Sequence, residues 1–187
     1  GLATANILAK RGYKVVVYEK NEQIGGRMGM FEKDGFRFDT GPSWYLMADV
    51  FEHYFKLVGE KVEDHYQLKK LSPAYKIFYD YTKPLTITGD LQKDALTFEK
   101  LETGSGKQLI KYVEKAELNY KLALQNFLYN PFRSSNGLIS FEILKKIPEF
   151  IRLFVQPLHS YVSRYFKSQV LQQVLEYPMV FLGASPY

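Results

Sequence analysis

The 187-residue chain contains no cysteine. This absence excludes a disulfide scaffold, a thiolate nucleophile and any metal site built on cysteine. We predict no metal centre. Any oxidation or reduction that the protein performs must therefore come from a bound cofactor, because no side chain in the sequence supplies redox chemistry of its own.

Long apolar runs and charge of one sign are also lacking. No segment is apolar over enough residues to span a bilayer. The formal net charge is +5, and the basic residues are interspersed with acidic ones. We therefore predict no nucleic acid partner, because nucleic acid binding requires a concentrated basic surface.

The residues of common hydrolytic sites form no convergent pattern. The three histidines, His53, His65 and His159, are scattered over predicted helices and loops, where a surface or structural role is more common than that of a base. No serine lies in a nucleophile elbow, and no pair of carboxylates is placed for acid–base work. The sequence alone identifies no catalytic residue.

The first twenty residues, GLATANILAKRGYKVVVYEK, predict a helix followed by a buried strand. Alanine and leucine recur at helical spacing, and Gly12 suits the left-handed turn that ends a helix. The run from Tyr13 to Tyr18 is β-branched and aromatic, which is typical of a parallel strand covered on both faces. Together these elements predict half of a βαβ unit.

Gly1 and Glu19 have the spacing of a dinucleotide fold. In that fold the third glycine of a GxGxxG turn opens the helix, and an acidic residue about 20 positions later binds the ribose. We expect Gly1 to be that third glycine, with the first strand and the first two glycines absent from this chain. The alternative is one of the many other α/β domains in which a small-residue helix precedes a valine strand.

Two further motifs follow the predicted strand. KNEQIGGRM places Gly25, Gly26 and Arg27 just beyond its carboxyl end, where doubly wound sheets bind ligands and where backbone N–H groups and an arginine can meet a phosphate. Taken alone, this stretch fits a surface loop with a solvated arginine better. GFRFDTGPSWY then predicts a short strand, from its alternating Phe36 and Phe38, and a sharp turn after it.

These motifs resemble the amino-terminal FAD-binding region of the amine-oxidase-like flavoproteins. The combination of glycine helix, strand-end acid, GGR and FD-x-GPS is specific to that superfamily. Within it the chain is most similar to the bacterial phytoene and dehydrosqualene desaturases of carotenoid synthesis, through GPSWYLM, DVFEHYF, NFLYNPF and FLGASPY. Flavoproteins of this type are much longer, so the resemblance implies an interior piece of a larger protein.

The resemblance implies FAD as the cofactor. It places an acid at the adenosine ribose, glycines and an arginine at the diphosphate and ribityl region, and the turn after the second motif's strand near the flavin ring. In chain order, the implied FAD-binding residues are Gly1, Glu19, Lys20, Gly25, Gly26, Arg27, Asp39, Gly41, Pro42 and Ser43.

The predicted fold class is α/β, in two domains. An incomplete Rossmann-like FAD-binding domain covers residues 1–65 and includes an amphipathic helix at 49–59. A largely helical substrate domain with a small mixed or antiparallel sheet covers residues 66–187.

Periodicity assigns the elements of the second domain. Its strands are predicted within 66–73, 74–81 and 84–88, and its helices at 90–101 and 104–129. The longer helix carries an aromatic stripe. The stripe lines either an apolar substrate tunnel or, as is more common, a plain core.

The segment at 137–168 is basic and aromatic and is interrupted by Pro148 and Pro157. It predicts either short helices in a membrane interface or a helical hairpin packed on its own domain, and the residues alone favour the hairpin. The resemblance favours the membrane, because phytoene is an insoluble hydrocarbon. It implies an apolar isoprenoid substrate and a cytoplasmic protein peripheral to the inner face of the membrane.

The resemblance also implies the reaction, which is FAD-dependent desaturation of a long apolar isoprenoid such as phytoene or dehydrosqualene in carotenoid biosynthesis. One alternative is an amine or porphyrinogen oxidase on the same fold, which a polar, carboxylate-bearing pocket would favour. The other is a non-catalytic truncated fragment without a complete FAD site. A strand ending in G-x-G-x-x upstream of Gly1 would distinguish the enzyme from the fragment.

Overall fold

A computed structural model of the chain describes residues 1–42, 44–79, 83–124, 128–129 and 155–187. Within them the chain forms two compact units, Gly1–Lys69 (unit 1) and Lys70–Tyr187 (unit 2), and each is described by itself. Ser43, the Asn130-Pro131 helix break and most of the basic aromatic segment lie outside the described residues. Among the described helices, none combines the length and the hydropathy that a membrane span requires.

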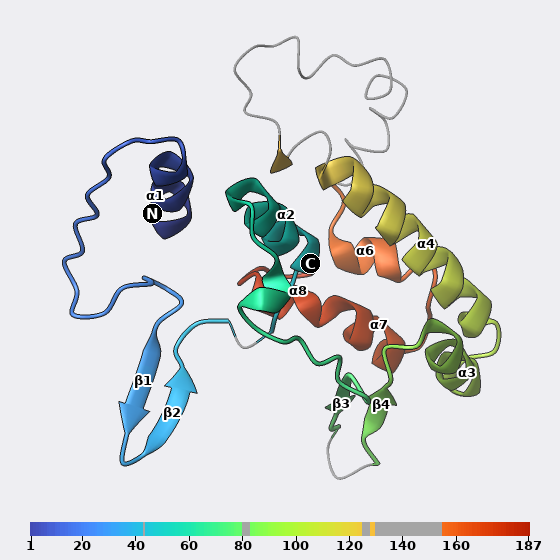
Figure 1. Cartoon of the computed structure of the whole chain (residues 1–187). Helices are drawn as coiled ribbons and strands as arrows, with labels where there is room; N and C mark the ends of the chain where they lie inside the picture. Colours follow the sequence, from blue (N-terminus) through green and yellow to red (C-terminus); the bar gives the residue numbers. More distant parts are fainter. Residues whose placement is uncertain (43, 80–82, 125–127, 130–154) are drawn as a thin grey trace, which may run out of the picture. The chain divides into compact units, whose positions relative to one another are not determined.

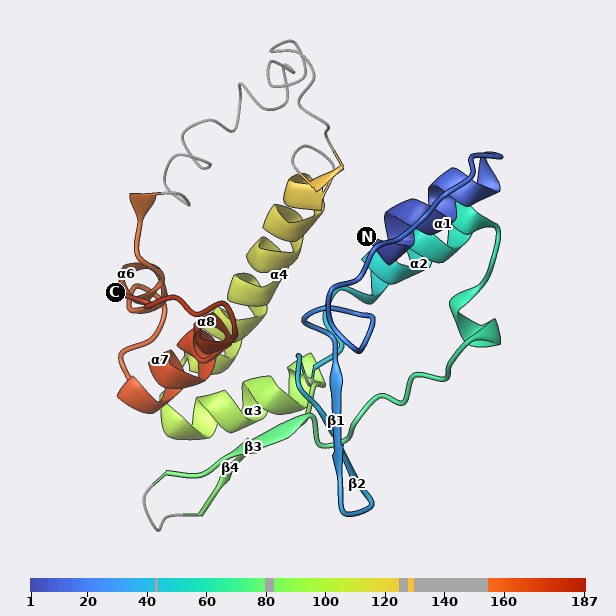
Figure 2. The ribbon, with the colours of Figure 1, turned by 90° about the vertical axis from the view of Figure 1, so that its left-hand side faces the viewer.

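Two helices of unit 1 lie side by side (Figure 2). α1 (Leu2–Lys10) begins directly after Gly1, and Gly12 takes the predicted left-handed conformation just beyond its end, with φ of +86°. α2 (Ala48–Val58) ends at Gly59, which has the same conformation, with φ of +78°. Both predicted helices are confirmed.

Side-chain hydrogen bonds join these two helices. The Asn6 amide donates to the Tyr54 hydroxyl over 2.9 Å. The Lys10 ammonium donates to the carbonyl of Val58 at the carboxyl end of α2, where the helix dipole favours a cation. Lys10 therefore lies at the carboxyl ends of both α1 and α2. A short 3-10 helix, η1 (Val62–Asp64), follows α2.

β1 (Met30–Lys33) and β2 (Phe36–Asp39) form an antiparallel hairpin (Figure 1). Asp34 and Gly35 connect them, and both have positive φ, +52° and +81°. This is the type I′ geometry whose twist matches the strands of a two-residue hairpin. The predicted strand at residues 36–38 is confirmed, and β1 adds a partner that the sequence analysis did not assign.

The predicted parallel strand at residues 13–19 is wrong for this structure. The segment forms no strand, and among the described residues no strand pairs with it. Its side chains face solvent, with exposed fractions of 72% for Val16 and 92% for Tyr18. A strand is stable only where neighbouring strands satisfy its backbone N–H and C=O groups, and the described residues offer this segment no such neighbour.

Unit 2 packs a small two-stranded sheet against its helices. Its predicted helix at 90–101 is confirmed, and the helix predicted at 104–129 is confirmed over Ser105–Ala123. The stretch at 66–73 forms no strand, and its prediction is wrong, because adjacent lysines and Pro73 give it neither an apolar face nor a full set of backbone donors. In chain order the elements are the antiparallel pair β3 (Tyr75–Ile77) and β4 (Leu85–Ile87), then α3 (Leu91–Leu101), α4 (Ser105–Ala123), α6 (Leu158–Val162), α7 (Gln169–Glu176) and α8 (Pro178–Phe181).

Two carboxylates join neighbouring elements of unit 2 through hydrogen bonds. The buried Asp94 on α3 accepts hydrogen bonds from the backbone N–H and the hydroxyl of Thr88, both at 2.8 Å, which ties the end of β4 to α3. Glu102, at the end of α3, accepts from the backbone N–H groups of Lys167 at 2.9 Å and Ser168 at 2.7 Å. The start of α7 is thereby held against the end of α3.

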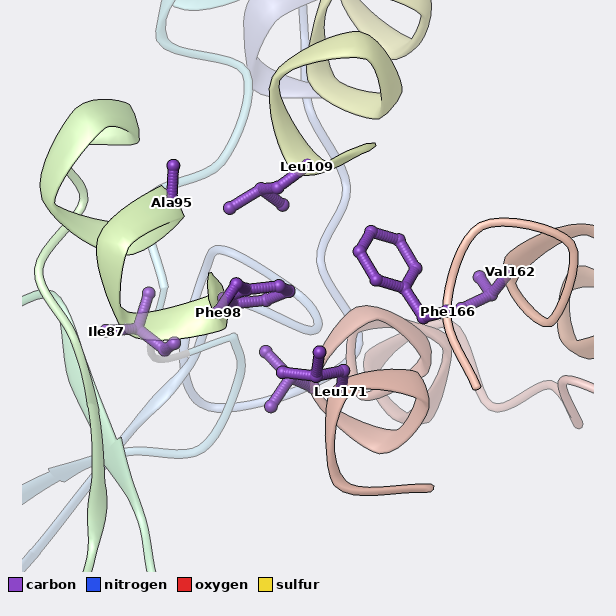
Figure 3. Close-up of a cluster of buried hydrophobic side chains, with 8 residues drawn as sticks. Ile87, Ala95, Phe98, Leu109, Val162, Phe166 and Leu171 are labelled. Atoms are coloured by element: carbon purple, nitrogen blue, oxygen red, sulfur yellow. The ribbon is translucent and has the colours of Figure 1, made fainter. Parts of the chain in front are cut away.

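The hydrophobic core belongs to unit 2 (Figure 3). The Phe98 and Phe166 rings meet edge to face, with centroids 5.8 Å apart. In unit 1 the buried apolar residues are Val58 and Val62. The core cluster, which draws on β4, α3, α4, α6, α7 and the α6–α7 connection, consists of Ile87, Ala95, Phe98, Leu109, Val162, Phe166, Leu171 and Val174.

Replacing Phe98 with alanine is expected to destabilise the intact protein strongly. Phe98 is 2% exposed, so the substitution leaves a cavity in the core and should lower the free energy of unfolding by about 3–5 kcal/mol. The matched control is Phe78→Ala, because Phe78 is 74% exposed and its loss should cost less than about 0.5 kcal/mol. Denaturant unfolding of both variants measures the difference, and equal losses would contradict this description of the core.

Candidate functional site

The β1–β2 hairpin brings the two glycine motifs together at its open end. Gly25, Gly26 and Arg27 precede β1, whereas Thr40, Gly41 and Pro42 follow β2. The register continues beyond the strands, because the backbone N–H of Thr40 donates to the carbonyl of Gly29 over 3.0 Å. Motifs predicted separately from the sequence therefore form one pair of adjoining loops, here called the GGR loop (25–29) and the TGP loop (40–42).

Gly41 makes the closest approach between these loops. A Cβ atom at residue 41 would collide with the carbonyl oxygen of Arg27 and would lie 3.3 Å from the Cα atom of Met28. Its φ lies outside the left-handed region, so glycine is required here by lack of space rather than by backbone conformation. A Cβ at Gly29 would similarly lie 3.0 Å from the Thr40 hydroxyl oxygen. Any larger residue at position 41 must push the two loops apart.

The GGR loop turns through left-handed backbone conformations. Gly25 and Gly26 have φ of +111° and +62°, which residues with a side chain rarely adopt. The N–H of Met28 donates to the carbonyl of Gly25 over 3.2 Å and closes the turn. A Cβ at Gly26 would meet nothing within 4 Å, so this side of the loop is open to a ligand.

Two cavities open beside the paired loops. Their volumes of about 390 and 530 Å³ fall within the range of ~300–1,000 Å³ that is typical of ligand pockets. The larger has a cationic and backbone-rich lining of Arg27, Met28, Thr40, Gly41 and Pro42. The smaller has an aromatic and apolar lining with one acid, made of Met28, Asp39, Pro42, Trp44, Tyr45, Leu46 and Phe51.

Tyr45 is anchored in the aromatic wall of the smaller cavity. Its hydroxyl shares a hydrogen bond of 2.5 Å with that of Tyr66, and its ring lies 4.7 Å from the Phe51 ring centroid. Desolvation, followed by the interaction with Tyr66, raises the pKa of Tyr45 well above its usual range. The phenol therefore stays neutral at physiological pH. Trp44 and Tyr45 belong to the segment GPSWYLM that carries the family resemblance, and no sequence pattern predicts their place in this wall.

The residues predicted to bind the adenosine part of FAD make hydrogen bonds within their own segments. Oε1 of the exposed Glu19 accepts from the backbone N–H of Asn21 at 2.9 Å and from its side-chain amide at 3.0 Å. Lys20 is exposed beside it. Gly1 accepts the first backbone bond of α1, from Ala5 at 2.9 Å, and a Cβ there would meet nothing within 4 Å. These hydrogen bonds are local to each residue's own segment, so the grouping of Gly1, Glu19 and the GGR loop stays a prediction.

The titratable residues of the described ranges offer no metal site, because no group of His, Asp and Glu there is placed to hold an ion. His65 lies 3.5 Å from a carboxylate oxygen of Glu60, and its ring packs 4.8 Å from that of Phe55. His159 Nδ1 lies 2.9 Å from the buried carboxylate of Glu176.

Comparison with known proteins decides the family. The model of the family described as flavin containing amine oxidoreductase matches residues 1–179. The chain belongs to this family. The predicted resemblance to the amine-oxidase-like flavoproteins, an α/β fold class and a flavin as the cofactor class of the family are thereby confirmed.

Within this family, the chain is similar to curated proteins that are named as desaturases. The carotenoid 3,4-desaturase of Haloarcula japonica is 40% identical over 186 residues. The 4,4'-diapophytoene desaturase (4,4'-diaponeurosporene-forming) of Staphylococcus haemolyticus is 30% identical over 190 residues. Each alignment covers 100% of this chain and 37% of the relative, so the chain spans 37% of the length of these proteins. The predicted similarity to carotenoid desaturases is confirmed.

Replacing Gly41 with alanine in the full-length protein is expected to weaken FAD binding roughly tenfold or more, which corresponds to at least about 1.4 kcal/mol. The added Cβ forces the Arg27 carbonyl away and opens the paired loops. Titration of the apoprotein with FAD measures the affinity.

Gly35→Ala is the control for this test. Gly35 lies at the opposite end of the same hairpin, has open space around it and has φ of +81°. Its replacement should lower stability by about 1–2 kcal/mol and leave FAD affinity unchanged. Wild-type affinity in Gly41→Ala would contradict the role of the close approach.

Proposed function

We propose that the full-length protein is an FAD-dependent oxidoreductase that desaturates a long apolar isoprenoid, such as phytoene or dehydrosqualene, in carotenoid biosynthesis. The observation that carries the proposal is the pairing of the GGR and TGP loops beside two cavities. The family match and the two desaturase relatives over the whole chain support the choice of reaction.

The residues of the paired loops fit a flavin dinucleotide. Arg27 lines the larger cavity together with loop backbone, which suits an anionic diphosphate. The aromatic lining of the smaller cavity suits a flat, mostly apolar ring, with Asp39 available to accept a hydrogen bond. Gly41 permits the close approach that forms both cavities. Glu19, whose Oε1 is already held by Asn21, is the proposed acceptor for the ribose hydroxyls.

The proposal includes a Rossmann-like arrangement of the FAD-binding domain. α1 and the exposed segment at 13–19 are proposed to complete a Rossmann-like sheet with strands supplied by the rest of the protein. The exposure of Val16 and Tyr18 supports this, because a parallel strand buried on both faces needs the apolar side chains that this segment carries. Unit 2, with its own core and mostly helical elements, is the proposed substrate domain.

In this reaction, bound FAD supplies the acceptor for the hydride that leaves the substrate. The protein's own residues supply position and environment. Arg27 offsets the charge of the diphosphate, while Trp44 and Tyr45 give the smaller cavity an aromatic lining. The lining of the smaller cavity has aromatic and apolar side chains, which suit a hydrocarbon beside it.

We also propose peripheral association with the cytoplasmic face of the membrane. The support comes from the basic aromatic sequence between residues 137 and 168 and from the chemistry of the proposed substrate, which partitions into a bilayer. Cations next to apolar aromatic side chains suit anionic head groups.

Expression of the full-length protein in cells that accumulate phytoene or dehydrosqualene tests the function. The organic extract should gain multi-peaked visible absorption, because desaturation extends the conjugated system. Cells that lack the isoprenoid precursor provide the control. A colourless extract, from cells whose purified protein carries bound flavin, would contradict the proposed reaction and favour an amine or porphyrinogen oxidase.

A further inference from the structure

Unit 2 contains a cavity of about 380 Å³ that the proposed flavin loops do not use, since those loops belong to unit 1. α4 contributes Tyr112, Ala116 and Asn119 to its lining, and α6 and α8 contribute apolar side chains from the other walls. Helix α4 therefore contributes to both the core and the cavity. Leu109 lies in the core, whereas Tyr112, Ala116 and Asn119, which follow it along the helix, line the cavity.

The lining is uncharged. Among the described residues that form it, the polar groups are two tyrosine hydroxyls and the side-chain amides of Asn119 and Gln156. Burial raises the pKa of Tyr112, so its hydroxyl stays neutral. A charged ligand would lose its hydration without gaining a countercharge, whereas an uncharged apolar chain loses nothing by entering. The charge pattern of the cavity therefore favours a hydrocarbon.

One wall of the cavity is built on the core. The Tyr112 ring meets the Tyr165 ring edge to face at 5.7 Å and the Phe166 ring at 6.2 Å. Phe166 is completely buried in the core cluster. Tyr161, which lines the cavity from α6, lies 5.7 Å from Tyr112. Packed rings of this kind keep the wall in place before a ligand arrives, which lowers the entropic cost of binding.

We propose that this cavity binds one end of a linear, uncharged isoprenoid chain, and that Ala116 sets the space available to it. The inference rests on the proposed function for the choice of an isoprenoid. The cavity volume lies at the lower end of the ~300–1,000 Å³ range of ligand pockets, so it accommodates an end of a long chain rather than all of it. Ala116 is exposed to the cavity and has the smallest side chain of the lining, so a larger residue there fills the space directly.

Binding of radiolabelled squalene, a linear isoprenoid hydrocarbon, to the full-length FAD-loaded protein in detergent micelles tests the site. Ala116→Phe should weaken squalene binding at least tenfold, and Ala116→Leu should weaken it by a smaller factor. Both variants should keep their bound flavin. Ser160→Phe is the matched control, because Ser160 is an exposed small residue on α6 between the lining residues Leu158 and Tyr161. It should bind squalene as the wild type does.

The outcomes separate this site from the proposed reaction. Graded loss in the two Ala116 variants, with flavin and the Ser160 control unchanged, supports the site even if the wild type forms no coloured product. Equal squalene binding by wild type and Ala116→Phe overturns it, whatever the colour of the extract. If Ala116→Phe fails to fold, Ala116→Leu and the cavity-enlarging Met179→Ala decide, and wild-type binding in both overturns the proposal.

Discussion

The contact between Gly41 and the Arg27 carbonyl is the constraint on which the candidate site depends. Arg27 and Gly41 are fourteen residues apart in sequence, and their loops meet there with no room for a side chain. The I′ turn at Asp34 and Gly35 sets the register of the hairpin, and the register sets which backbone atoms of the loops oppose each other. Both residues of this approach line the larger, cationic cavity.

The two units differ in how much apolar surface each buries within itself. Unit 2 has a continuous core in which Phe98 and Phe166 meet, and carboxylates such as Glu102 fasten its helices through backbone N–H groups. Unit 1 buries little apolar surface within the described residues and leaves Val16 and Tyr18 in solvent.

Local signals predicted local structure well. Gly12 and Gly59 ended helices where their left-handed conformations occur, and the alternation around Phe36 marked β2. The Asp34-Gly35 pair is a hairpin signal in the sequence, and it marks the turn that joins β1 to β2. The prediction of a strand at 13–19 was wrong because strand formation depends on partner strands that are distant in sequence. Each motif of the site could be predicted from the sequence by itself, but the Gly41 contact depends on the hairpin register, which the Asp34–Gly35 turn sets outside those motifs.

Hydrogen–deuterium exchange of the full-length protein, with and without FAD, tests the central claim most directly. Exchange reports the protection of individual backbone segments. The account predicts that FAD protects the GGR loop and the TGP loop together, while the hairpin tip at Asp34 and Gly35 exchanges at the same rate in both states. Protection of only one loop, or of neither while FAD is bound, would contradict the claim that the paired loops form the flavin site.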